Sequence, residues 1–295
     1  MPARAARRVM VVANPAAGLR RGRDAGEAAA SAARRAGARS ELVRTRGPGD
    51  ARRLAAKAWA EGFDTVLAVG GDGTAHEAAN GAAGTPVVLG VVPSGTMNLL
   101  ARVLGVPMDP AGAAESAVLG RRRIALRPGK AGETLFLLMA GIGFDAWVLR
   151  ELLAGRRGKV AFRHYVLGGL RGLLTYPFPT IRLEMSGESV DATAAIVGRA
   201  PLYGGFLRPT PHAALESDTL EVCGFTARSA GGLLRILPAL WSGAHIGRPG
   251  IVDRSATWLK ASSEHPDIPV QLDGELAGRL PMEFAISDRE LVLAR

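Results

Sequence analysis

Cysteine and long apolar runs are both scarce in this sequence. The chain has one cysteine among 295 residues, Cys223, which excludes a disulfide framework and any metal cluster held by several thiolates. The longest apolar run, residues 135–144, is interrupted by two glycines and is too short to cross a membrane as a helix. The apolar residues 9–13 are too few for a signal peptide and lead directly into Asn14 and Pro15. We therefore expect a cytoplasmic protein.

Aromatic residues are also few, at 5% of the chain, and helix-turn-helix, zinc-finger and stacking-aromatic motifs are lacking. The sequence therefore predicts no nucleic-acid partner. Acidic residues are outnumbered: 37 Lys and Arg against 27 Asp and Glu give a net charge of +10. This charge favours anionic partners, either phosphorylated small molecules or an anionic membrane surface. The alternative is a merely solvated basic surface in a chain rich in Arg and Ala.

The first part of the chain alternates short apolar runs with helical stretches, within a globular balance of 47% hydrophobic and 22% charged residues. Strands are predicted at residues 9–13, 41–44, 65–69 and 87–92, and helices at 22–36, 50–60 and 75–80. The last helix is expected to stop at Gly81 in a left-handed cap. Such alternation predicts a doubly wound α/β nucleotide-binding domain over residues 1–121, with ligands at the carboxyl ends of its strands.

The pattern changes after about residue 121, where turns separate short strands and few helices intervene. Strands are predicted at residues 123–126, 134–139, 180–185, 193–197, 220–225, 256–261, 269–272 and 282–286. This indicates an antiparallel β-sandwich or barrel domain over residues 122–295, whose last residues can return to the first domain. Two amphipathic stretches interrupt it, at residues 147–174 and 231–242.

The strongest motif is Gly70-Gly71-Asp72-Gly73-Thr74, directly after a predicted buried strand. Glycines there let the backbone N–H groups approach a phosphate that a side chain would keep away. The helix that follows adds a partial positive charge at its N-terminus. Asp72 would then orient Mg²⁺ at the phosphates. The alternative is an ordinary turn between a strand and a helix.

Two further polar loops follow neighbouring strands, and strand ends of one parallel sheet meet at one edge. Their candidate nucleotide-binding residues are Asn14, Pro15 and Gly18 in one loop and Ser94, Gly95, Thr96 and Asn98 in the other. Thr96 as a plain helix cap is the alternative. The P-loop pattern is absent. Residues 141–146 fit a dinucleotide-binding pattern, but Val166 stands about where an acidic residue is needed, so we interpret this segment as a glycine-rich bend.

A third candidate segment is Asp273-Gly274-Glu275, after a predicted strand. Two carboxylates on either side of a glycine in a tight turn can reach a ligand hydroxyl and its metal ion. The alternative is an unremarkable surface hairpin.

These motifs together resemble the diacylglycerol kinase catalytic-domain family, which includes sphingosine kinases and bacterial soluble lipid kinases. The resemblance covers nearly the whole chain and is carried by residues 14–18, 70–74, Glu77, Asn80, Gly81, Gly95, Thr96, Asn98, Ala101, Arg102, 141–146 and 273–275. It implies a nucleotide domain, a β-rich lipid domain and an active site in the cleft between them. The implied activity is transfer of phosphate from ATP, with Mg²⁺, to the hydroxyl of diacylglycerol or another sphingoid or glycerolipid, in phospholipid biosynthesis.

The resemblance also assigns roles to single residues. It implies that Glu275 is the general base for the lipid hydroxyl, with Asp273 beside it, and that Asp72 binds Mg·ATP. Thr96 and Thr45 become ATP contacts.

A structural magnesium site is implied as well. The segment of residues 215–220 resembles one that holds Mg²⁺ in bacterial relatives, with the Asp218 carboxylate and the carbonyls of Leu215 and Leu220 as ligands. The chain departs from the family pattern at Thr219 and Leu99, where glycine and aspartate are usual, and at His76 in place of asparagine.

Three questions stay open from the sequence. The basic amphipathic residues 147–153 and 162–174 could lie on an anionic membrane, or simply cover the β-domain. An NAD kinase shares only residues 70–74 and Asn80, and a catalytically silent nucleotide- or lipid-binding regulator is a third function. The oligomeric state is open too, a homodimer included.

Overall fold

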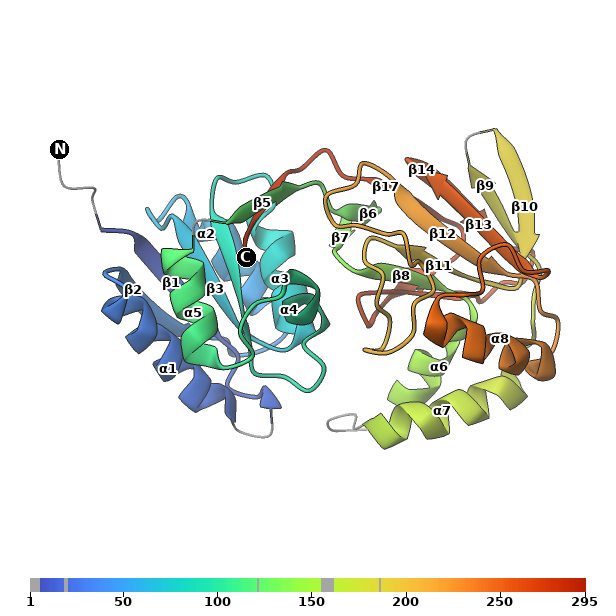
Figure 1. Ribbon diagram of the computed structural model, residues 1–295, viewed down its shortest axis with the longest axis horizontal. Helices are drawn as coiled ribbons and strands as arrows, with labels where there is room; N and C mark the ends of the chain where they lie inside the picture. Colours follow the sequence, from blue (N-terminus) through green and yellow to red (C-terminus); the bar gives the residue numbers. More distant parts are fainter. Residues whose placement is uncertain (1–5, 19–20, 121, 155–161, 186) are drawn as a thin grey trace. The chain divides into compact units, whose positions relative to one another are not determined.

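The computed structural model describes residues 6–18, 21–120, 122–154, 162–185 and 187–295. The chain forms two compact units, coloured from blue to red along the sequence in Figure 1. The first comprises Met1–Pro128 and Ser287–Arg295, and the second comprises Gly129–Ile286. The sequence pattern changes after residue 121, whereas the structural division follows residue 128. The difference arises because the strand at 123–126 hydrogen-bonds into the sheet of the first unit.

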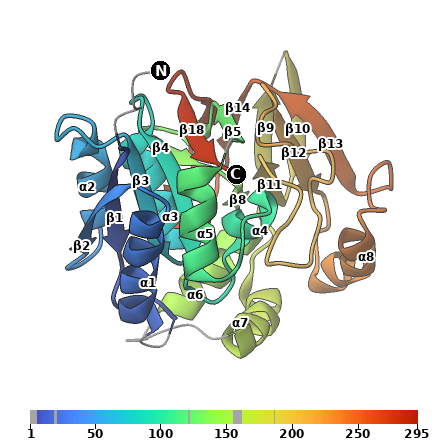
Figure 2. The ribbon, with the colours of Figure 1, turned by 60° about the vertical axis from the view of Figure 1, so that its left-hand side comes forward.

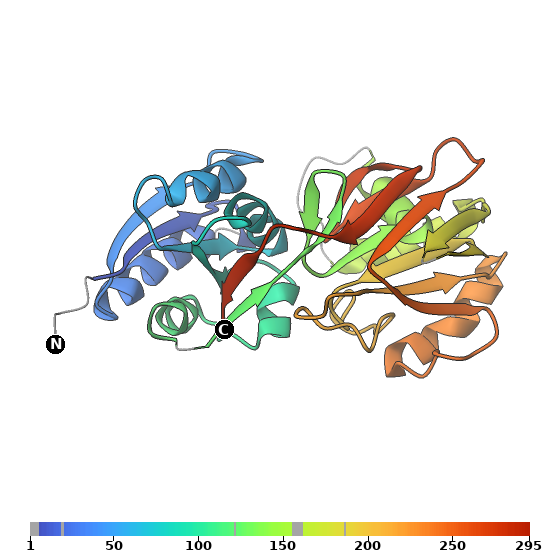
Figure 3. The ribbon, with the colours of Figure 1, turned by 90° about the horizontal axis from the view of Figure 1, so that it is seen from above.

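The first unit is built on one six-stranded sheet. Its strands, in spatial order, are β2 (Arg39–Arg44), β1 (Arg8–Ala13), β3 (Thr65–Gly70), β4 (Val88–Pro93), β18 (Leu291–Ala294) and β5 (Arg123–Leu126). All neighbouring pairs are parallel except β18 and β5, which lie side by side in Figure 3. The predicted parallel α/β sheet is thus confirmed.

Helices cover this sheet on both faces. Two pairs pack together, α1 (Arg21–Arg35) with α5 (Pro110–Leu119) and α2 (Asp50–Ala58) with α3 (Asp72–Ala82), and α4 (Leu99–Leu104) follows β4. Figure 2 shows α1 and α5 in front of the strands. Successive strand residues point to opposite faces, and Val11 and Val12 are both buried, so neither face is open to water. Alanines fill the α1 and α5 side, which keeps these helices close to the sheet.

Gly81 lies inside α3 and does not cap it. The helix continues to Ala82 and the residue after it, Ala83, has a φ of −59°, so the predicted left-handed cap at Gly81 is wrong. A Cβ on Gly81 would lie 2.2 Å from the carbonyl oxygen of Arg52 in α2. This glycine is therefore needed for the close approach of two helices.

The second unit contains two six-stranded sheets, antiparallel throughout. One sheet has the order β10 (Glu188–Ala192), β9 (Ile181–Met185), β14 (Trp258–Ser262), β17 (Met282–Ile286), β6 (Gly129–Ala131), β7 (Thr134–Phe136). The other has the order β13 (Ile251–Ala256), β12 (Leu220–Phe225), β11 (Ala194–Gly198), β8 (Met139–Ile142), β15 (Pro269–Leu272), β16 (Glu275–Arg279).

One core joins the two sheets, since Ile142, Val222 and Val270 of the second sheet share it with Leu183 and Phe284 of the first. The predicted antiparallel sandwich is thus confirmed. Two predicted strands are in fact pairs of strands: residues 134–139 form β7 and β8, and 256–261 join the end of β13 to β14. In both places the chain passes from one sheet to the other, which ends one ladder and starts the next.

Among the described residues of this unit, three segments are helical: α6 (Phe144–Leu153), α7 (Phe162–Thr175) and α8 (Ala230–Ser242). The amphipathic stretch predicted at 147–174 becomes α6 and α7, which pack against each other. Within the ranges that the structure describes, no helix combines the length and apolar character needed to cross a bilayer.

The Gly81 contact leads to a stability prediction. Gly81→Ala should lower the free energy of unfolding by about 1–3 kcal/mol, because the added methyl group forces α2 and α3 apart. Gly231→Ala is the matched control, since nothing lies within 4 Å of a Cβ on this α8 glycine, and it should be neutral or stabilising. Urea unfolding of both variants and the parent checks this; equal effects of the two substitutions would contradict it.

Candidate functional site

The carboxyl ends of β1 and β3 form the natural ligand site of the first unit. From β1 the chain winds to β2 on one side, and then to β3 and β4 on the other. In open α/β sheets, ligands bind outside the strand ends at such a switch point. The loops that start there are the ones singled out in the sequence: Asn14 follows β1, Gly71 follows β3 and Ser94 follows β4.

Hydrogen bonds tie these strand ends together. The Asn14 side-chain amide donates to the Thr74 hydroxyl in the first turn of α3 at 3.1 Å, and the Asn14 carboxamide oxygen accepts from the N–H of Ala16 at 2.9 Å. The N–H of Thr45, the first residue after β2, donates to the Ala13 carbonyl at 2.9 Å. Asn14 and Thr45 therefore lie at the same edge as the glycine-rich loop; strand order predicted this for Asn14, whereas Thr45 was suggested only by the family resemblance.

Glycine allows two of the loops to touch through their backbones. A Cβ on Gly95 would lie 2.4 Å from the Cα of Gly71, and a Cβ on Gly70 would lie 2.3 Å from the Thr74 hydroxyl oxygen. The Ser94 N–H donates to the Gly70 carbonyl at 2.8 Å. Larger residues would separate the loops, and the start of α3, with N–H groups that lack helical partners, would be displaced.

Asp72 and Asn98 hold the neighbouring loop in place. Asp72 is the first residue of α3, and its carboxylate accepts from the N–H of Leu100 in α4 at 3.2 Å. Asn98 has a left-handed φ of 50° and closes its own turn: its amide oxygen accepts from the Gly95 N–H at 2.9 Å and its amide nitrogen donates to the Gly95 carbonyl at 3.0 Å. Asn98 thus shapes the loop that follows β4.

Ser94 has a buried hydroxyl at this edge of the sheet. Its hydroxyl oxygen is buried and has no hydrogen-bond partner among the described residues. Buried polar atoms are almost always paired, so an unpaired hydroxyl beside glycine loops and a helix N-terminus suits an anionic ligand. Thr96, two residues on, is exposed, and Gly18 has a left-handed φ of 53°.

These residues fit a magnesium–nucleotide group. Mg²⁺ keeps several waters and takes one or two carboxylates together with substrate phosphates, so Asp72 would suffice as the protein ligand. Among the residues that the structure covers, no cluster of three His, Cys, Asp or Glu side chains could hold a metal unaided. A cation at Asp72 would therefore depend on the phosphates.

The α3 helix also organises the loop after β2. Glu77 accepts from the N–H groups of Gly49 at 2.8 Å and Ala51 at 3.1 Å, at the start of α2. His76 is buried in α3, and the Asn80 side chain donates to its carbonyl at 3.0 Å. Both side chains therefore help to build α3 and the loop beside it, and His76 lies within the helix that the sequence predicts at 75–80.

In the second unit, Asp273 is an anchor. The residue has a left-handed φ of 50° in the turn between β15 and β16. Its carboxylate accepts three backbone hydrogen bonds, from Leu137 at 2.7 Å, Leu138 at 2.8 Å and Met139 at 2.9 Å. This fixes the turn to the start of β8. Glu275, the first residue of β16, is exposed.

A polar chain supports the same turn from the other side. The Gly274 N–H donates to the Gln271 side-chain oxygen at 2.6 Å, and the Gln271 amide nitrogen donates to Asp145 at 2.7 Å. The Tyr203 hydroxyl donates to the other oxygen of Asp145. Burial raises the pKa of the Asp145 carboxyl, while the two hydrogen bonds oppose that shift.

This chain explains the glycine motif at 141–146. A Cβ on Gly141 would lie 1.7 Å from the Asp145 carboxylate, so the glycine makes room for that side chain. Gly143, with a φ of 82°, is the N-cap residue directly before α6. Gln271 and Tyr203 were not predicted from the sequence as site residues. The sequence signal for this polar chain was the four-residue spacing of Gly141 and Asp145.

The predicted structural magnesium site does not fit. The carbonyl of Leu215, one of its proposed ligands, accepts a hydrogen bond from the guanidinium of Arg199, as do the carbonyls of Ser217 and Thr219 at 2.7 Å. Asp218 is exposed and Leu220 starts β12. A positive side chain therefore engages one of the three oxygen ligands that the resemblance assigns to a cation, and two carbonyls next to the others.

A doubly wound domain with glycine loops at its switch point, joined to an antiparallel sandwich that presents a carboxylate, defines a class of two-domain phosphotransferases. Two family models match the chain: the diacylglycerol kinase catalytic domain over residues 8–126, and the YegS C-terminal NAD kinase beta sandwich-like domain over residues 139–295. The chain therefore belongs to the diacylglycerol kinase family, whose members are lipid kinases.

Known relatives agree with this assignment. A diacylglycerol kinase of Mycobacterium tuberculosis (strain ATCC 25618 / H37Rv) is 33% identical over 260 residues, covering 83% of this chain and 81% of that protein. A diacylglycerol kinase of Staphylococcus aureus (strain Newman) is 28% identical over 261 residues, covering 87% of this chain and 82% of that protein. A crystal structure of a provisionally named diacylglycerol kinase from Bacillus anthracis str. Sterne has a TM-score of 0.78 at 21% identity. The match covers 98% of this chain and 96% of that chain, which shows a shared fold.

The Gln271 link can be tested directly. In Gln271→Ala the Gly274 amide loses its acceptor and should exchange with solvent about five- to tenfold faster, because one such hydrogen bond contributes about 1 kcal/mol. Tyr203→Phe is the control, since it leaves the Gln271–Gly274 bond in place and should not change this amide. Hydrogen exchange followed by NMR or mass spectrometry measures both; unchanged exchange in Gln271→Ala would refute the link.

Proposed function

We propose that this protein transfers the γ-phosphate of ATP, in a magnesium-dependent reaction, to the free hydroxyl of diacylglycerol or a closely related glycerolipid. The observation that carries the nucleotide part is the contact between the Gly71 and Gly95 backbones beside the unpaired, buried Ser94 hydroxyl. The names of the M. tuberculosis and S. aureus relatives support diacylglycerol as the acceptor.

The residues of the first unit would bind and orient the nucleotide. N–H groups of residues 70–74 and the start of α3 would hold the phosphates, since glycine allows their close approach. The Ser94 hydroxyl would donate a hydrogen bond to a phosphate oxygen. Asn14, Pro15, Gly18, Thr45 and Thr96 would line the rest of the site at the same strand ends.

Asp72 would hold Mg²⁺, which when bound neutralises the charge of the phosphates and orients them for in-line transfer. The carboxylate is pre-positioned by its hydrogen bond from Leu100. Phosphoryl transfer needs mainly such positioning and charge neutralisation from the protein.

Glu275 would accept the proton of the acceptor hydroxyl as its oxygen attacks the phosphorus. Its exposure makes it accessible to a substrate, whereas Asp273 is engaged by three backbone N–H groups. Asp273 then acts as a positioning residue for the turn that carries the base. This assignment differs from the sequence-based expectation that both carboxylates meet the substrate.

A soluble acceptor is the second candidate. The family model that matches the second unit is named for the NAD kinase β-sandwich, so that architecture also occurs with a nucleotide substrate. The match of the first unit to the diacylglycerol kinase catalytic domain favours the lipid. Partition of the labelled product separates the two.

The reaction is tested by transfer of ³²P from γ-labelled ATP, with Mg²⁺, to lipids in mixed micelles, followed by organic extraction. Diacylglycerol should carry label into the organic phase. Asp72→Ala should abolish transfer, and Glu275→Gln should lower kcat about 100-fold or more with little change in KM for ATP, since it removes only proton acceptance. Glu283→Gln, at another exposed strand glutamate, is the control and should retain parental rates.

Other outcomes have distinct meanings. Label confined to the aqueous phase would favour the soluble acceptor, and lack of turnover despite ATP binding would favour a silent regulator. An unchanged kcat in Glu275→Gln would remove the base assignment alone.

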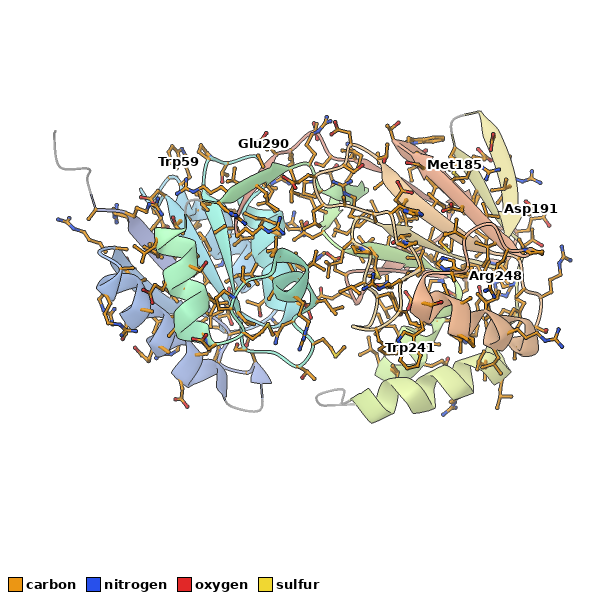
Figure 4. The ribbon with its side chains drawn as sticks, in the orientation of Figure 1. Trp59, Met185, Asp191, Trp241, Arg248 and Glu290 are labelled. Carbon is orange, nitrogen blue, oxygen red and sulfur yellow. The ribbon has the colours of Figure 1, made fainter. Side chains whose placement is uncertain are left out.

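We further propose that α8 docks the protein on an anionic membrane. Leu234, Leu237 and Trp241 lie three and four residues apart on one helix face and are 47%, 41% and 68% exposed. Phe206 packs its ring edge-to-face with Trp241, with centroids 6.5 Å apart, and Trp241 is labelled in Figure 4. An apolar helix face of this kind, which includes a tryptophan, is typical of helices that lie in the membrane interface.

Three exposed arginines lie within α8 or in the segments before and after it in sequence: Arg235 in α8, Arg208 before it and Arg248 after it. They would attract anionic headgroups. The stretch predicted for this role from the sequence is partly engaged elsewhere: Arg150 pairs with Asp267 at 2.7 Å and stacks over Trp147. The side chains of residues 162–167 lie outside the described part of the chain.

Membrane docking is measured by co-sedimentation with vesicles. Trp241→Ala should weaken binding to phosphatidylglycerol-containing vesicles roughly tenfold or more, because a tryptophan contributes a large apolar area. Trp59→Ala is the matched control, since Trp59 is 51% exposed at the end of α2 in the first unit, and it should bind as the parent does. Equal binding of Trp241→Ala and parent, or no preference for anionic vesicles, would refute docking through α8.

A further inference from the structure

Arg199 is the largest side chain that the second unit buries almost completely, with 1% of its surface exposed. It directly follows β11, and the N–H groups of Arg199 and Ala200 donate to the Leu138 carbonyl at 2.8 and 3.1 Å. The backbone at Arg199 is therefore fixed. An arginine keeps its charge at every pH at which proteins fold, so its burial requires compensating partners.

Carbonyl oxygens supply that compensation. One terminal nitrogen of the guanidinium donates to the carbonyls of Ser217 and Thr219, each at 2.7 Å, and the other donates to the carbonyl of Leu215. The loop before β12 thus wraps its carbonyl dipoles around a positive group. Carbonyl oxygens converging on one point are also the ligands that a hard divalent cation selects.

A metal ion on the same oxygens would be repelled. Mg²⁺ sits about 2.1 Å from its oxygen ligands, so an ion on the Leu215 carbonyl would lie within about 5 Å of the guanidinium. The Leu215 oxygen is already an acceptor for Arg199. The carbonyl set is thus complementary to the side chain that fills it.

Thr219 completes the loop without a metal. Its N–H donates to the Ser217 hydroxyl at 3.1 Å, its own hydroxyl lies 2.9 Å from that hydroxyl, and it donates to Glu221 at 3.4 Å. Ser255 on β13 donates to the same Glu221 oxygen at 2.9 Å. The residue that departs from the usual glycine therefore contributes side-chain hydrogen bonds that close the loop.

We propose that the Arg199 guanidinium replaces a structural metal ion in this protein, and that the loop of residues 215–219 folds and stays folded without a divalent cation. The magnesium dependence of the proposed kinase then resides in the nucleotide site alone. The loop inference itself does not depend on which acceptor is phosphorylated.

The first test is Mn²⁺ binding to the nucleotide-free protein, measured by electron paramagnetic resonance. We expect the parent and Asp218→Asn to bind the same amount of Mn²⁺, because Asp218 holds no ion. A stoichiometric ion that Asp218→Asn removes would overturn the proposal. An ion that Asp72→Asn removes and Asp218→Asn leaves in place belongs to the nucleotide site and supports it, so the two sites are distinguished.

The second test is thermal unfolding with EDTA and with Mg²⁺. The parent should unfold at the same temperature in both, and Arg199→Met should unfold about 10 °C lower in EDTA, because a buried charged partner has been removed from three carbonyls. Arg182→Met is the control, since Arg182 is an exposed strand residue paired with Asp191, and it should shift little. Two results would overturn the proposal. One is stabilisation of the parent by Mg²⁺ that is lost in Asp218→Asn; the other is an Arg199→Met protein that unfolds at the same temperature as the parent.

If Arg199→Met fails to fold, the Mn²⁺ measurement on the parent and on Asp218→Asn still decides. These two proteins retain the Arg199 contacts, so their metal content reports on the loop as it is built in this chain.

Discussion

The candidate nucleotide site depends on one steric constraint, the contact between the Gly71 and Gly95 backbones. Parallel strands bring the ends of β3 and β4 to neighbouring positions, but their loops can meet only where side chains are missing. With the loops in contact, Asp72 reaches the start of α4, Asn14 reaches α3, and Ser94 lies buried with an unpaired hydroxyl. The polar groups proposed to hold phosphate and magnesium are thereby placed within one edge of one sheet.

The second unit fixes its loops by charge instead. The Asp273 carboxylate gathers three N–H groups of the segment before β8, and the Arg199 guanidinium gathers three carbonyls of the segment before β12. The carboxylate thus accepts hydrogen bonds from N–H groups, and the guanidinium donates hydrogen bonds to carbonyls. Both segments adjoin β8 or β12 of the same sheet, the sheet that also carries Glu275. The proposed base, Glu275, would be presented by the turn that Asp273 fixes.

Local pattern predicted the fold class and most of the candidate site. Alternating apolar runs and helices define the α/β sheet, and glycine loops after strands mark the switch point, because both signals lie within a few consecutive residues. Arg199, Gln271 and Tyr203 were missed because their partners lie elsewhere in the sequence; Gln271 and Asp145, for example, are 126 positions apart. Gly81 was misinterpreted for the same reason, since Arg52 rather than the helix end explains it. Single-residue roles that depend on distant partners need the tertiary structure.

The position of β18 has a consequence for synthesis on the ribosome. This strand, Leu291–Ala294, separates β4 from β5, although those two are made long before it. A nascent chain that has emerged as far as residue 128 therefore has all the helices of its first unit and a sheet with a missing strand. The edges of β4 and β5 stay without that partner until the whole intervening sandwich has been translated. Closure of the first sheet thus comes late in synthesis, and a truncation that removes β18 would leave two unpaired strand edges for aggregation.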